Sequence, residues 1–296
     1  MRPSEYQGIA AFVQAQSRRN LTGNLPAVRV LTIAGSDSGG GAGIQADLKT
    51  FAALGAYGAS VISAVTAQNT QGVQAVYPLP PEIIRAQAEA VLSDIRIDAV
   101  KIGMLPDAQT AQAVAAVLRR YTPPFVVLDP VLRASSGDDL SGGALAVLQN
   151  ELLPLADMVT PNTAELACLC GGSEAQNEAE LWAQGRKLQT RFGAKNVLLK
   201  GGHFDDGSEA CDRLLFSDGN IAHYRLPRLN TPNTHGTGCT LASAIAALFP
   251  QTPSLSEAVR LAKEYVHGAM LHAADWRLGK ENGNGALAHF GLHQAV

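Results

Sequence analysis

The sequence has few of the residues that would place it in several large classes of protein. Its 296 residues include only four cysteines, Cys168, Cys170, Cys211 and Cys239, too few for the disulfide framework of a secreted domain. Lysine and arginine number 23 and aspartate and glutamate 26, so the net charge of -3 gives no general basic field. We therefore do not expect nucleic acid or an acidic membrane as the main partner.

Long apolar runs are also missing. No stretch approaches the roughly 18 consecutive apolar residues that a membrane-spanning helix needs. Residues 1–20 contain only the short apolar patch IAAFV, which is not the core of a signal peptide. We expect a cytoplasmic protein.

The sequence does contain enough apolar residues for a large core, with 46% hydrophobic and 17% charged residues. After a polar extension at residues 1–27, short apolar runs such as VRVLTIAG and FVVLDP alternate with helical patterns such as PEIIRAQAEAVLSDI. Strands that alternate with helices need crossover connections, which favour a parallel sheet covered on both faces. We predict an α/β fold in which residues 28–296 form one doubly wound, mostly parallel central sheet with helices on both faces.

The last third of the chain departs from this alternation. Residues 211–226 contain two alternating runs around a D-G-N turn, a pattern typical of a hairpin at a sheet edge. Two helices, at residues 238–249 and 255–276, are then expected to complete the fold.

In open α/β sheets, ligands bind beyond the carboxyl ends of the strands, so the residues that follow each apolar run are the candidate site. Two glycine-rich turns are among them, GSDSGGGAG at residues 35–43 and HGTGC at residues 235–239. Such turns leave backbone N–H groups free for a phosphate. Lysine stabilises the charge of a transferring phosphoryl group, and carboxylates suit Mg²⁺. These turns, together with Asp129, Glu165 and Lys200, predict a site for a nucleoside triphosphate with magnesium.

Each of these features also has a structural alternative that the sequence leaves open. The first glycine-rich loop could be only a tight turn. Asn162 could cap a helix, with Glu165 completing a capping box three residues later. Asp129 could simply end its strand, and Lys200 could be an exposed lysine at a strand end.

Two common nucleotide motifs do not fit the first loop. The P-loop pattern requires a lysine after its last glycine, but residue 41 is glycine. The dinucleotide pattern lacks its acidic ribose ligand, because the second strand ends in TAQNT. A dehydrogenase is therefore disfavoured. We interpret His203 and His235 as hydrogen-bonding loop residues rather than catalysts.

Seven ordered motifs give the chain a close resemblance to a known family. They are AGSDSGGGAGIQADLKTF, AQNTQGV, KIGML, LDPV, TPNTAE, LLKGGH and NTHGTGC. Together they resemble the hydroxymethylpyrimidine/phosphomethylpyrimidine kinases of thiamin biosynthesis, members of the ribokinase superfamily. The resemblance implies ATP-dependent phosphorylation of 4-amino-5-hydroxymethyl-2-methylpyrimidine and then of its monophosphate. It also implies a ribokinase-like fold without a separate lid domain, usually as a homodimer.

Two alternatives to this activity stay open. Some of the neighbouring pyridoxal kinases share the cysteine-bearing loop, so vitamin B6 phosphorylation is a competing activity. A pyrimidine-binding regulatory protein that has lost catalysis is the non-enzymatic alternative, although the intact lysine, carboxylates and cysteine argue against it.

The resemblance also implies roles for individual residues. The substrate ring would contact Gln68, Gly35, Ala42, Asp47, Met104 and Val131. ATP and its phosphates would contact Asn162, Lys200, Thr237 and Gly238, and the amides from Gly236 to Cys239 would form an anion hole. Asp129 and Glu165 would serve Mg²⁺. The side chains agree with a neutral heterocycle, since Gln68 offers a donor and an acceptor while Met104 and Val131 offer apolar surface.

Cys239 stands where the second glycine-rich turn becomes a helix. Taken alone, such a cysteine is more often part of the core, and no C-x-x-C spacing supports a metal site. A helix N-terminus lowers the pKa of a thiol from its usual value of about 8.5, whereas nearby phosphates would raise it. Our hypothesis is that Cys239 accepts the proton of the substrate hydroxyl, while the loop amides supply most of the electrostatic stabilisation.

Overall fold

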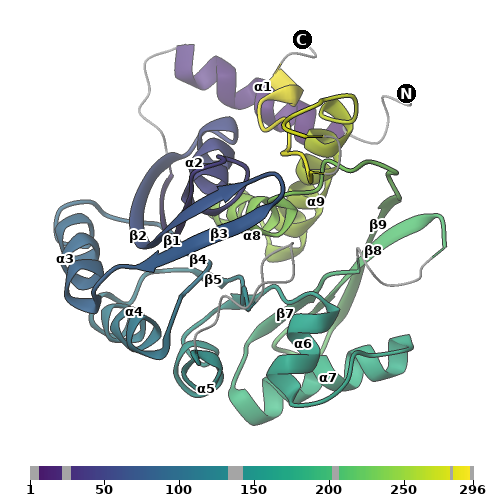
Figure 1. Ribbon diagram of the computed structural model, residues 1–296. Helices are drawn as coiled ribbons and strands as arrows, with labels where there is room; N and C mark the ends of the chain where they lie inside the picture. The colour runs from purple at the N-terminus through teal and green to yellow at the C-terminus, as the bar shows by residue number, and fades with distance from the viewer. Residues whose placement is uncertain (1–6, 22–27, 133–142, 202–206, 281–282, 294–296) are drawn as a thin grey trace.

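The computed structural model describes residues 7–21, 28–132, 143–201, 207–280 and 283–293. Within these residues the central element is a nine-stranded sheet in the order β3-β2-β1-β4-β5-β6-β7-β8-β9 (Figure 1). The six strands from β2 to β7 in this order are parallel. The strands are β1 (Arg29–Asp37), β2 (Tyr57–Asn69), β3 (Gly72–Pro78), β4 (Ala99–Ile102), β5 (Val126–Leu128), β6 (Met158–Val159), β7 (Asn196–Leu199), β8 (Glu209–Leu215) and β9 (Ile221–Pro227).

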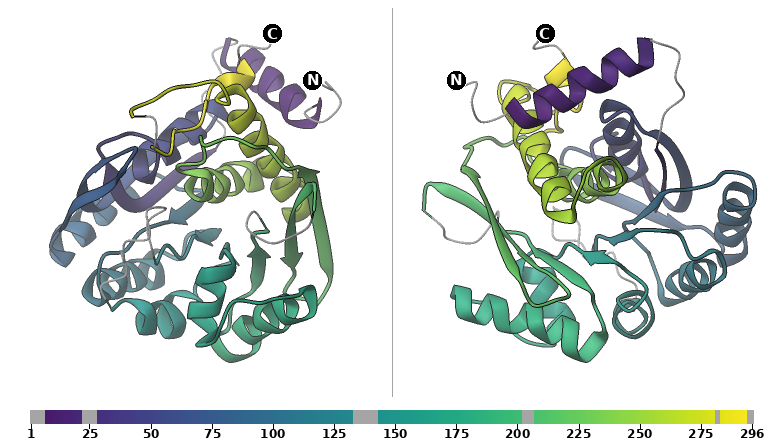
Figure 2. Two further views of the ribbon diagram at one scale, coloured as in Figure 1. Left: turned by 45° about the vertical axis from the view of Figure 1, so that its right-hand side comes forward. Right: turned by 180° about the vertical axis from the view of Figure 1, so that it is seen from behind.

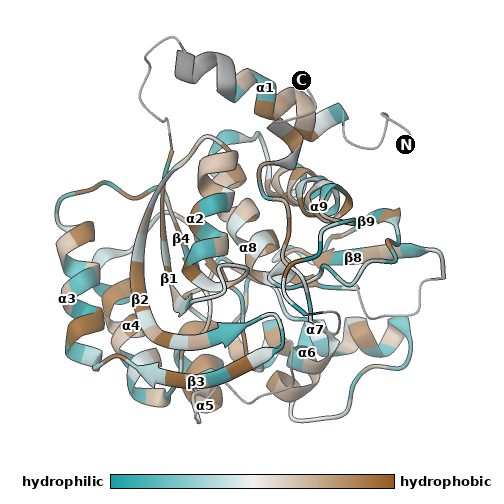
Figure 3. Cartoon of the chain, turned by 45° about the horizontal axis from the view of Figure 1, so that its top comes forward, coloured by the Kyte–Doolittle hydropathy of each residue, from teal (hydrophilic) through white to brown (hydrophobic). Residues whose placement is uncertain are grey.

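Helices cover both faces of this sheet (Figure 2). They are α1 (Gln7–Leu21), α2 (Gly43–Ala53), α3 (Pro81–Leu92), α4 (Ala108–Tyr121), α5 (Leu145–Val147), η2 (Leu148–Leu152), α6 (Thr163–Cys170), α7 (Glu178–Phe192), α8 (Thr237–Leu248), η3 (Phe249–Gln251), α9 (Leu255–His272) and η4 (Gly291–His293). In Figure 3 the outer helices α3 and α4 carry both apolar and polar residues, as expected for helices that bury one face.

Alternate residues of the central strands enter two separate cores. In β1, Leu31 and Ile33 belong to the core beneath α3, α4 and α7, whereas Val30 belongs to the core beneath α2, α8 and α9. In β5, Val127 lies in the second core and its neighbour Leu128 in the first. Successive side chains of a strand point to opposite faces, so a strand buried on both sides is a continuous apolar run. The predicted α/β fold with a mostly parallel sheet is therefore confirmed.

Antiparallel strands close the parallel sheet at both edges. The predicted hairpin is present as β8–β9, with Gly219 at φ 88° in its turn. A second hairpin, β2–β3, was not predicted. Its outer strand reads GVQAVYP, and the residues from Gln74 to Pro78 are exposed, so the sequence carries no pattern of core-facing residues there.

The final long helix ends earlier than expected, at His272 rather than at residue 276. The side-chain amide of Asn233 donates to the carbonyl groups of Ala273, Ala274 and Trp276 at 2.6, 3.4 and 3.2 Å. Terminal carbonyls of a helix need such partners. A residue 40 positions away in the sequence therefore holds the chain in a turn at this point.

Helix α1 lies within the sequence that was expected to be an extension. It packs beside α9 and η4 (Figures 1 and 2). Ile9 and Val13 are buried in the core formed with α8 and α9. The amide of Ile9 donates to Glu264 at 3.1 Å, and Gln16 donates to Gln251 at 2.8 Å. Across the described ranges, no helix combines the length and apolar character needed to cross a membrane.

Candidate active site

The carboxyl ends of the parallel strands open into one cavity of about 1170 Å³. This volume exceeds that of a typical pocket for one small ligand, which is about 300–1,000 Å³. Thirteen of the fourteen predicted site residues line it: Gly35, Ala42, Gln68, Met104, Asp129, Val131, Asn162, Glu165, Lys200, Gly236, Thr237, Gly238 and Cys239.

One wall of the cavity is apolar. Met104 is buried and packs with Ala64 and Val131. The hydroxyl of Ser63 donates to the carbonyl of Met104 at 2.7 Å, which fixes the backbone there. A Cβ atom at Gly35 would lie 2.6 Å from the methyl of Met104, so any larger residue there would displace the end of this side chain. The predicted apolar surface for a flat ring is present.

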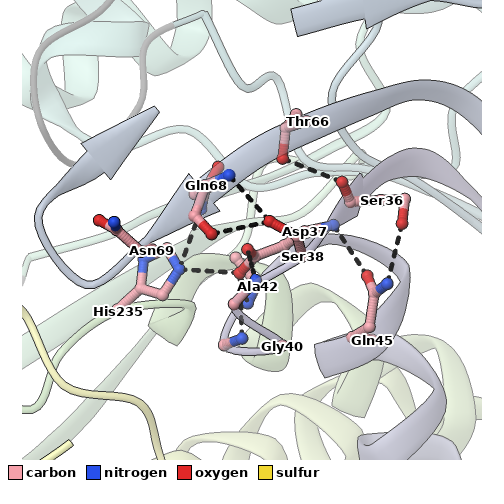
Figure 4. A network of polar contacts seen from close by, with 12 residues as sticks. Ser36, Asp37, Ser38, Gly40, Ala42, Gln45, Thr66, Gln68, Asn69 and His235 are labelled. Carbon is pink, nitrogen blue, oxygen red and sulfur yellow. Dashed lines mark hydrogen bonds and ion pairs between the residues drawn. The ribbon is translucent and has the colours of Figure 1, made fainter. Parts of the chain in front are cut away.

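A network of polar contacts ties the first glycine-rich loop to β2 and to the second loop (Figure 4). Asp37 accepts from the amides of Gly39, Gly41 and Ala42 at 2.7, 3.0 and 2.8 Å. His235 Nε2 lies 3.0 Å from Asp37 Oδ2. Burial alone would raise the pKa of Asp37, but the hydrogen bonds from His235 and the amides lower it below its usual value. The interpretation of His235 as a hydrogen-bonding residue is confirmed, and its partner Asp37 was missed.

Lys200 lies between two carboxylates. Its Nζ atom is 2.9 Å from Asp129 Oδ1 and 3.5 Å from Glu165 Oε2. All three side chains are nearly buried, with exposed fractions of 14%, 2% and 10%. Burial alone lowers the pKa of Lys200, but the two carboxylates outweigh it and hold the pKa above its usual value. The alternative of an ordinary exposed lysine is therefore wrong.

This cluster has one more carboxylate than it has ammonium groups. Burial is the main reason that the pKa of Glu165 is raised; Lys200 acts against the rise and Asp129 adds to it. In the described part of the chain, no three histidine, cysteine or acidic side chains enclose a metal ion. Mg²⁺ retains several waters and needs only one or two carboxylates. The two hard oxygen donors and their surplus negative charge therefore fit Mg²⁺.

The capping alternative for Asn162 is confirmed. Its side chain accepts from the amide of Glu165 at 2.8 Å, and Glu165 accepts from the amide of Asn162 at 2.8 Å, which completes a capping box at the start of α6. Because both residues also line the cavity, the cap holds the Glu165 carboxylate beside Lys200. The predicted contact of Asn162 with phosphate stays a prediction.

The second glycine-rich loop forms the N-terminus of α8. Gly236 is the N-cap residue with φ 85°, and a Cβ atom there would collide with the carbonyl oxygen of Gly41. Gly238 faces the charged cluster, because a Cβ atom there would lie 3.4 Å from Lys200 Nζ and 3.6 Å from Asp129 Oδ2. The first amides of a helix have no intrahelical partner, so this end presents donors and a partial positive charge. A phosphate at this end of α8 would meet both the helix amides and the Lys200 ammonium.

Two glycine substitutions distinguish the contribution of this loop to stability from its contribution to catalysis. For Gly238→Ala we expect unchanged thermal stability and a fall in kcat of about tenfold or more, because the methyl group meets only ordinary contacts but occupies the space beside Lys200. For Gly236→Ala we expect a clear loss of stability, because the backbone is left-handed and meets Gly41. Thermal melts and initial rates measure both. Equal stability losses in the two variants would contradict the assignment.

Cys239 lies in the first turn of α8, but the expected lowering of its pKa is wrong. Burial raises the pKa of the Cys239 thiol to about 11. Lys101 acts against this rise, whereas Asp47 and Asp129 add to it. With its pKa raised in this way, Cys239 is a neutral thiol at neutral pH in the ligand-free protein.

Asp47 is the predicted site residue that the structure places elsewhere. Its carboxylate is fully buried and both oxygens lie 2.9 Å from Lys101 Nζ. The hydroxyls of Thr32 and Ser243 each donate to it at 2.6 Å. Asp47 therefore lies outside the cavity wall, in a closed ion pair whose charges act on Cys239.

Two groups of residues in or near the cavity were missed by the sequence analysis. Lys101 stands inside an apolar strand, and a lysine in such a run is a signal of a buried partner. At the other end of the cavity, Asp212 Oδ2 lies 2.8 Å from Lys263 Nζ, and Asp212 Oδ1 accepts from the amide of Gly201. Four apolar residues also line the cavity: Leu226, Leu241, Val266 and Met270. Gly202 and His203 lie outside the described residues.

Comparisons with known proteins agree with this geometry. The family model described as phosphomethylpyrimidine kinase matches residues 37–286. The hydroxymethylpyrimidine/phosphomethylpyrimidine kinase of Escherichia coli strain K12 is 48% identical over 264 residues, covering 89% of this chain and 97% of its own. The enzyme of that name from Rhizobium meliloti is 54% identical over 263 residues, covering 88% of this chain and 96% of its own.

Solved structures extend the comparison to the fold. The crystal structure of phosphomethylpyrimidine kinase from Clostridium difficile has a TM-score of 0.72 and 42% identity, and covers 82% of this chain and 99% of its own. An ADP complex of Bacillus subtilis pyridoxal kinase has a TM-score of 0.80 and 31% identity, and covers 90% of this chain and 98% of its own.

Proposed function

Because this chain belongs to the phosphomethylpyrimidine kinase family, we propose that it transfers the terminal phosphoryl group of ATP to 4-amino-5-hydroxymethyl-2-methylpyrimidine and then to its monophosphate, in thiamin biosynthesis. The observation that carries the proposal is the position of the Lys200 ammonium beside Gly238 at the N-terminus of α8, where the ammonium and the helix amides can act on one phosphoryl group. Such transfer depends mainly on positioning and on stabilising charge.

The two substrates occupy opposite ends of the cavity in this proposal. The pyrimidine lies against Gly35, Ala42, Met104 and Val131, with Gln68 at its edge. The adenosine of ATP lies at the end lined by Leu226, Val266 and Met270. The phosphates lie between them, at Thr237, Gly238 and Lys200, with Asn162 near by. The volume of the cavity, larger than one small ligand needs, supports this division.

The reaction needs a nucleophile, a leaving group and a destination for one proton. The substrate hydroxyl oxygen bonds to the terminal phosphorus, and the bond from phosphorus to the bridging oxygen of ADP breaks. Cys239 accepts the hydroxyl proton in its thiolate form, which is the minor form at neutral pH because the pKa is raised to about 11. Lys200 and the amides from Gly236 to Cys239 stabilise the charge on the phosphoryl oxygens. Asp129 and Glu165 would hold Mg²⁺, which would supply positive charge to neutralise the phosphates.

A coupled assay of ADP release tests the activity. We expect turnover with the pyrimidine alcohol and with its monophosphate, and loss of turnover when EDTA removes Mg²⁺. Pyridoxal is compared in the same assay, because the Bacillus subtilis pyridoxal kinase has the same fold. We expect kcat/KM for the pyrimidine to exceed that for pyridoxal by at least about tenfold. No turnover of either pyrimidine would refute the proposed function.

The assembly and the location are further parts of the proposal. We propose a cytoplasmic homodimer in which residues 28–296 form one kinase domain and residues 1–27 an extension. Val65 on β2 and Tyr77 on β3 pair directly and are 46% and 68% exposed, which supports this hairpin as the contact between copies. Sedimentation velocity tests it, since a single 31.0 kDa species would exclude the dimer.

A further inference from the structure

One ring nitrogen of His235 contacts two neighbouring side chains. Nε2 lies 3.0 Å from Asp37 Oδ2 and 3.1 Å from the side-chain amide of Gln68 (Figure 4). His235 is nearly buried, with its side chain 14% exposed, and Asp37 is 3% exposed. A Cβ atom at Gly41 would collide with the imidazole, so that glycine gives the ring its place against the loop. The ring is therefore held in one orientation between the two partners.

The state of this nitrogen follows from Asp37. The carboxylate already accepts three backbone amides, two of them on the oxygen that faces His235. A carboxylate with these donors is an acceptor only. A bare Nε2 at 3.0 Å would set a lone pair against that oxygen, whereas a protonated Nε2 donates to it. Nε2 therefore carries the proton.

The orientation of the Gln68 amide follows in turn. The two ends of a carboxamide have the same shape, so hydrogen bonding assigns them. The Gln68 atom placed 3.1 Å from Nε2 is the amide nitrogen. Beside a protonated Nε2 this NH₂ group would set two donors against each other, whereas the amide oxygen in its place would share the single Nε2–H with Asp37 Oδ2. The backbone of Gln68 is fixed independently, because Ser38 Oγ accepts from its amide and donates to its carbonyl, both at 2.8 Å. His235 therefore determines only the orientation of the side-chain amide of Gln68.

We propose that His235, held by Asp37, is a positioning residue. It turns the side-chain oxygen of Gln68 toward His235 Nε2 and thereby directs the Gln68 NH₂ group toward the substrate. The cavity then presents a hydrogen-bond donor to the edge of the substrate ring, so the ring must carry an acceptor there, such as an unprotonated nitrogen. A ring with C–H at that position is disfavoured. This inference rests on the proposed function only for the identity of the ring as a pyrimidine, because the orientation of the Gln68 amide is a property of the ligand-free protein.

The orientation is tested without any substrate by NMR of protein with ¹⁵N-labelled histidine. The His235 signals are assigned by their loss in His235→Gln. We expect Nε2 of His235 to carry a proton, in a neutral or a charged ring. A neutral ring protonated only at Nδ1 would overturn the proposal, because Nε2 would then accept from the Gln68 NH₂. This result stands whether or not the protein phosphorylates a pyrimidine.

The specificity is tested with two aminopyridine analogues, each with one pyrimidine ring nitrogen replaced by C–H. We expect the wild type to disfavour one analogue by about tenfold in kcat/KM, the effect of one hydrogen bond. In His235→Leu we expect this ratio to fall below about twofold, and in His235→Gln, which keeps a donor, to be largely restored. A purely structural role would slow all substrates equally and leave the ratio intact, which would overturn the proposal.

The matched control is His223→Leu. His223 lies on β9, contacts Glu178 at 3.0 Å and does not line the cavity. We expect the wild-type ratio in this variant. If no pyrimidine is phosphorylated by the wild type, the proposed function fails, while the NMR result still decides the state of His235.

Discussion

Replacement of Lys200 by methionine is expected to lower kcat by about 10²–10³-fold, the usual effect of removing one group that stabilises transition-state charge. Methionine keeps the length of the side chain and removes the ammonium that faces Gly238. We expect KM for the pyrimidine to change by less than about threefold, because Lys200 lies beside the phosphates in the proposed arrangement. Single-turnover rates and steady-state constants measure the two effects separately.

A double variant, Lys200→Met with Glu165→Gln, separates the effect of losing the ammonium from the effect of leaving buried negative charge unpaired. Without Lys200, Asp129 and Glu165 face each other in a nearly buried site, and breaking such a cluster is itself costly. Glu165→Gln removes one of the two charges. We expect the double variant to regain stability but not kcat, because the phosphoryl group still lacks its positive partner. Recovery of kcat would show that Lys200 acts only on its carboxylates.

Lys195 supplies the control for Lys200. It directly precedes β7, at the opposite end of the strand from Lys200, and its ammonium lies 2.6 Å from Asp157. Its side chain is half exposed, and such surface pairs contribute about 1 kcal/mol or less to the free energy of unfolding. Lys195→Met is expected to leave kcat unchanged.

Removal of the Cys239 thiol is expected to affect the two phosphorylation steps very differently. The alcohol must lose a proton, whereas a phosphate monoester has a second pKa of about 6 and is already ionised at neutral pH. For Cys239→Ala we expect kcat for the alcohol to fall by about 10²–10⁴-fold at pH 9, the range for loss of a general base. We expect the rate with the monophosphate to stay within about threefold.

The raised pKa of Cys239 gives this prediction a pH signature. With a pKa of about 11, the thiolate fraction rises nearly tenfold for each pH unit below that value. We therefore expect kcat/KM for the alcohol to rise steeply between pH 7 and pH 9, and the monophosphate reaction to lack this rise. Cys170→Ala is the control, because burial also raises the pKa of Cys170, which lies outside the cavity. If kcat/KM for the alcohol did not change with pH, the Cys239 thiol would have no role in proton transfer. Cys239 would then contribute only its backbone amide to the anion hole.

The parallel part of the sheet could be predicted because its signals are local. Each strand from β1 to β7, apart from β3, is a short apolar run next to a helical pattern, and polar residues at the strand ends meet by the geometry of the fold. For the same reason Gln68, Asp129 and Lys200 could be placed at one site. The capping box of Asn162 and Glu165 could also be stated from spacing alone.

The errors arise where distant segments decide the outcome. Asp47 was placed in the pocket, but its partner Lys101 is 54 positions away and turns it into the protein interior. The pKa of Cys239 was expected to fall because a helix N-terminus is visible in the sequence, whereas its burial is not. Asp37 stood within a loop that was already singled out, but its link to His235 spans 198 positions.

Helix α1 has a consequence for how the chain folds during synthesis. Ile9 lies near the start of the chain, and its hydrogen-bonding partner Glu264 follows 255 residues later. At about 5–20 residues per second, roughly 13–50 s pass between the synthesis of the two. The apolar side of α1 therefore has no docking surface until α9 leaves the ribosome, long after the residues of β1 have been made. Contacts of such long sequence separation form late, so α1, which is made before the strands of the sheet, is expected to be among the last helices to dock.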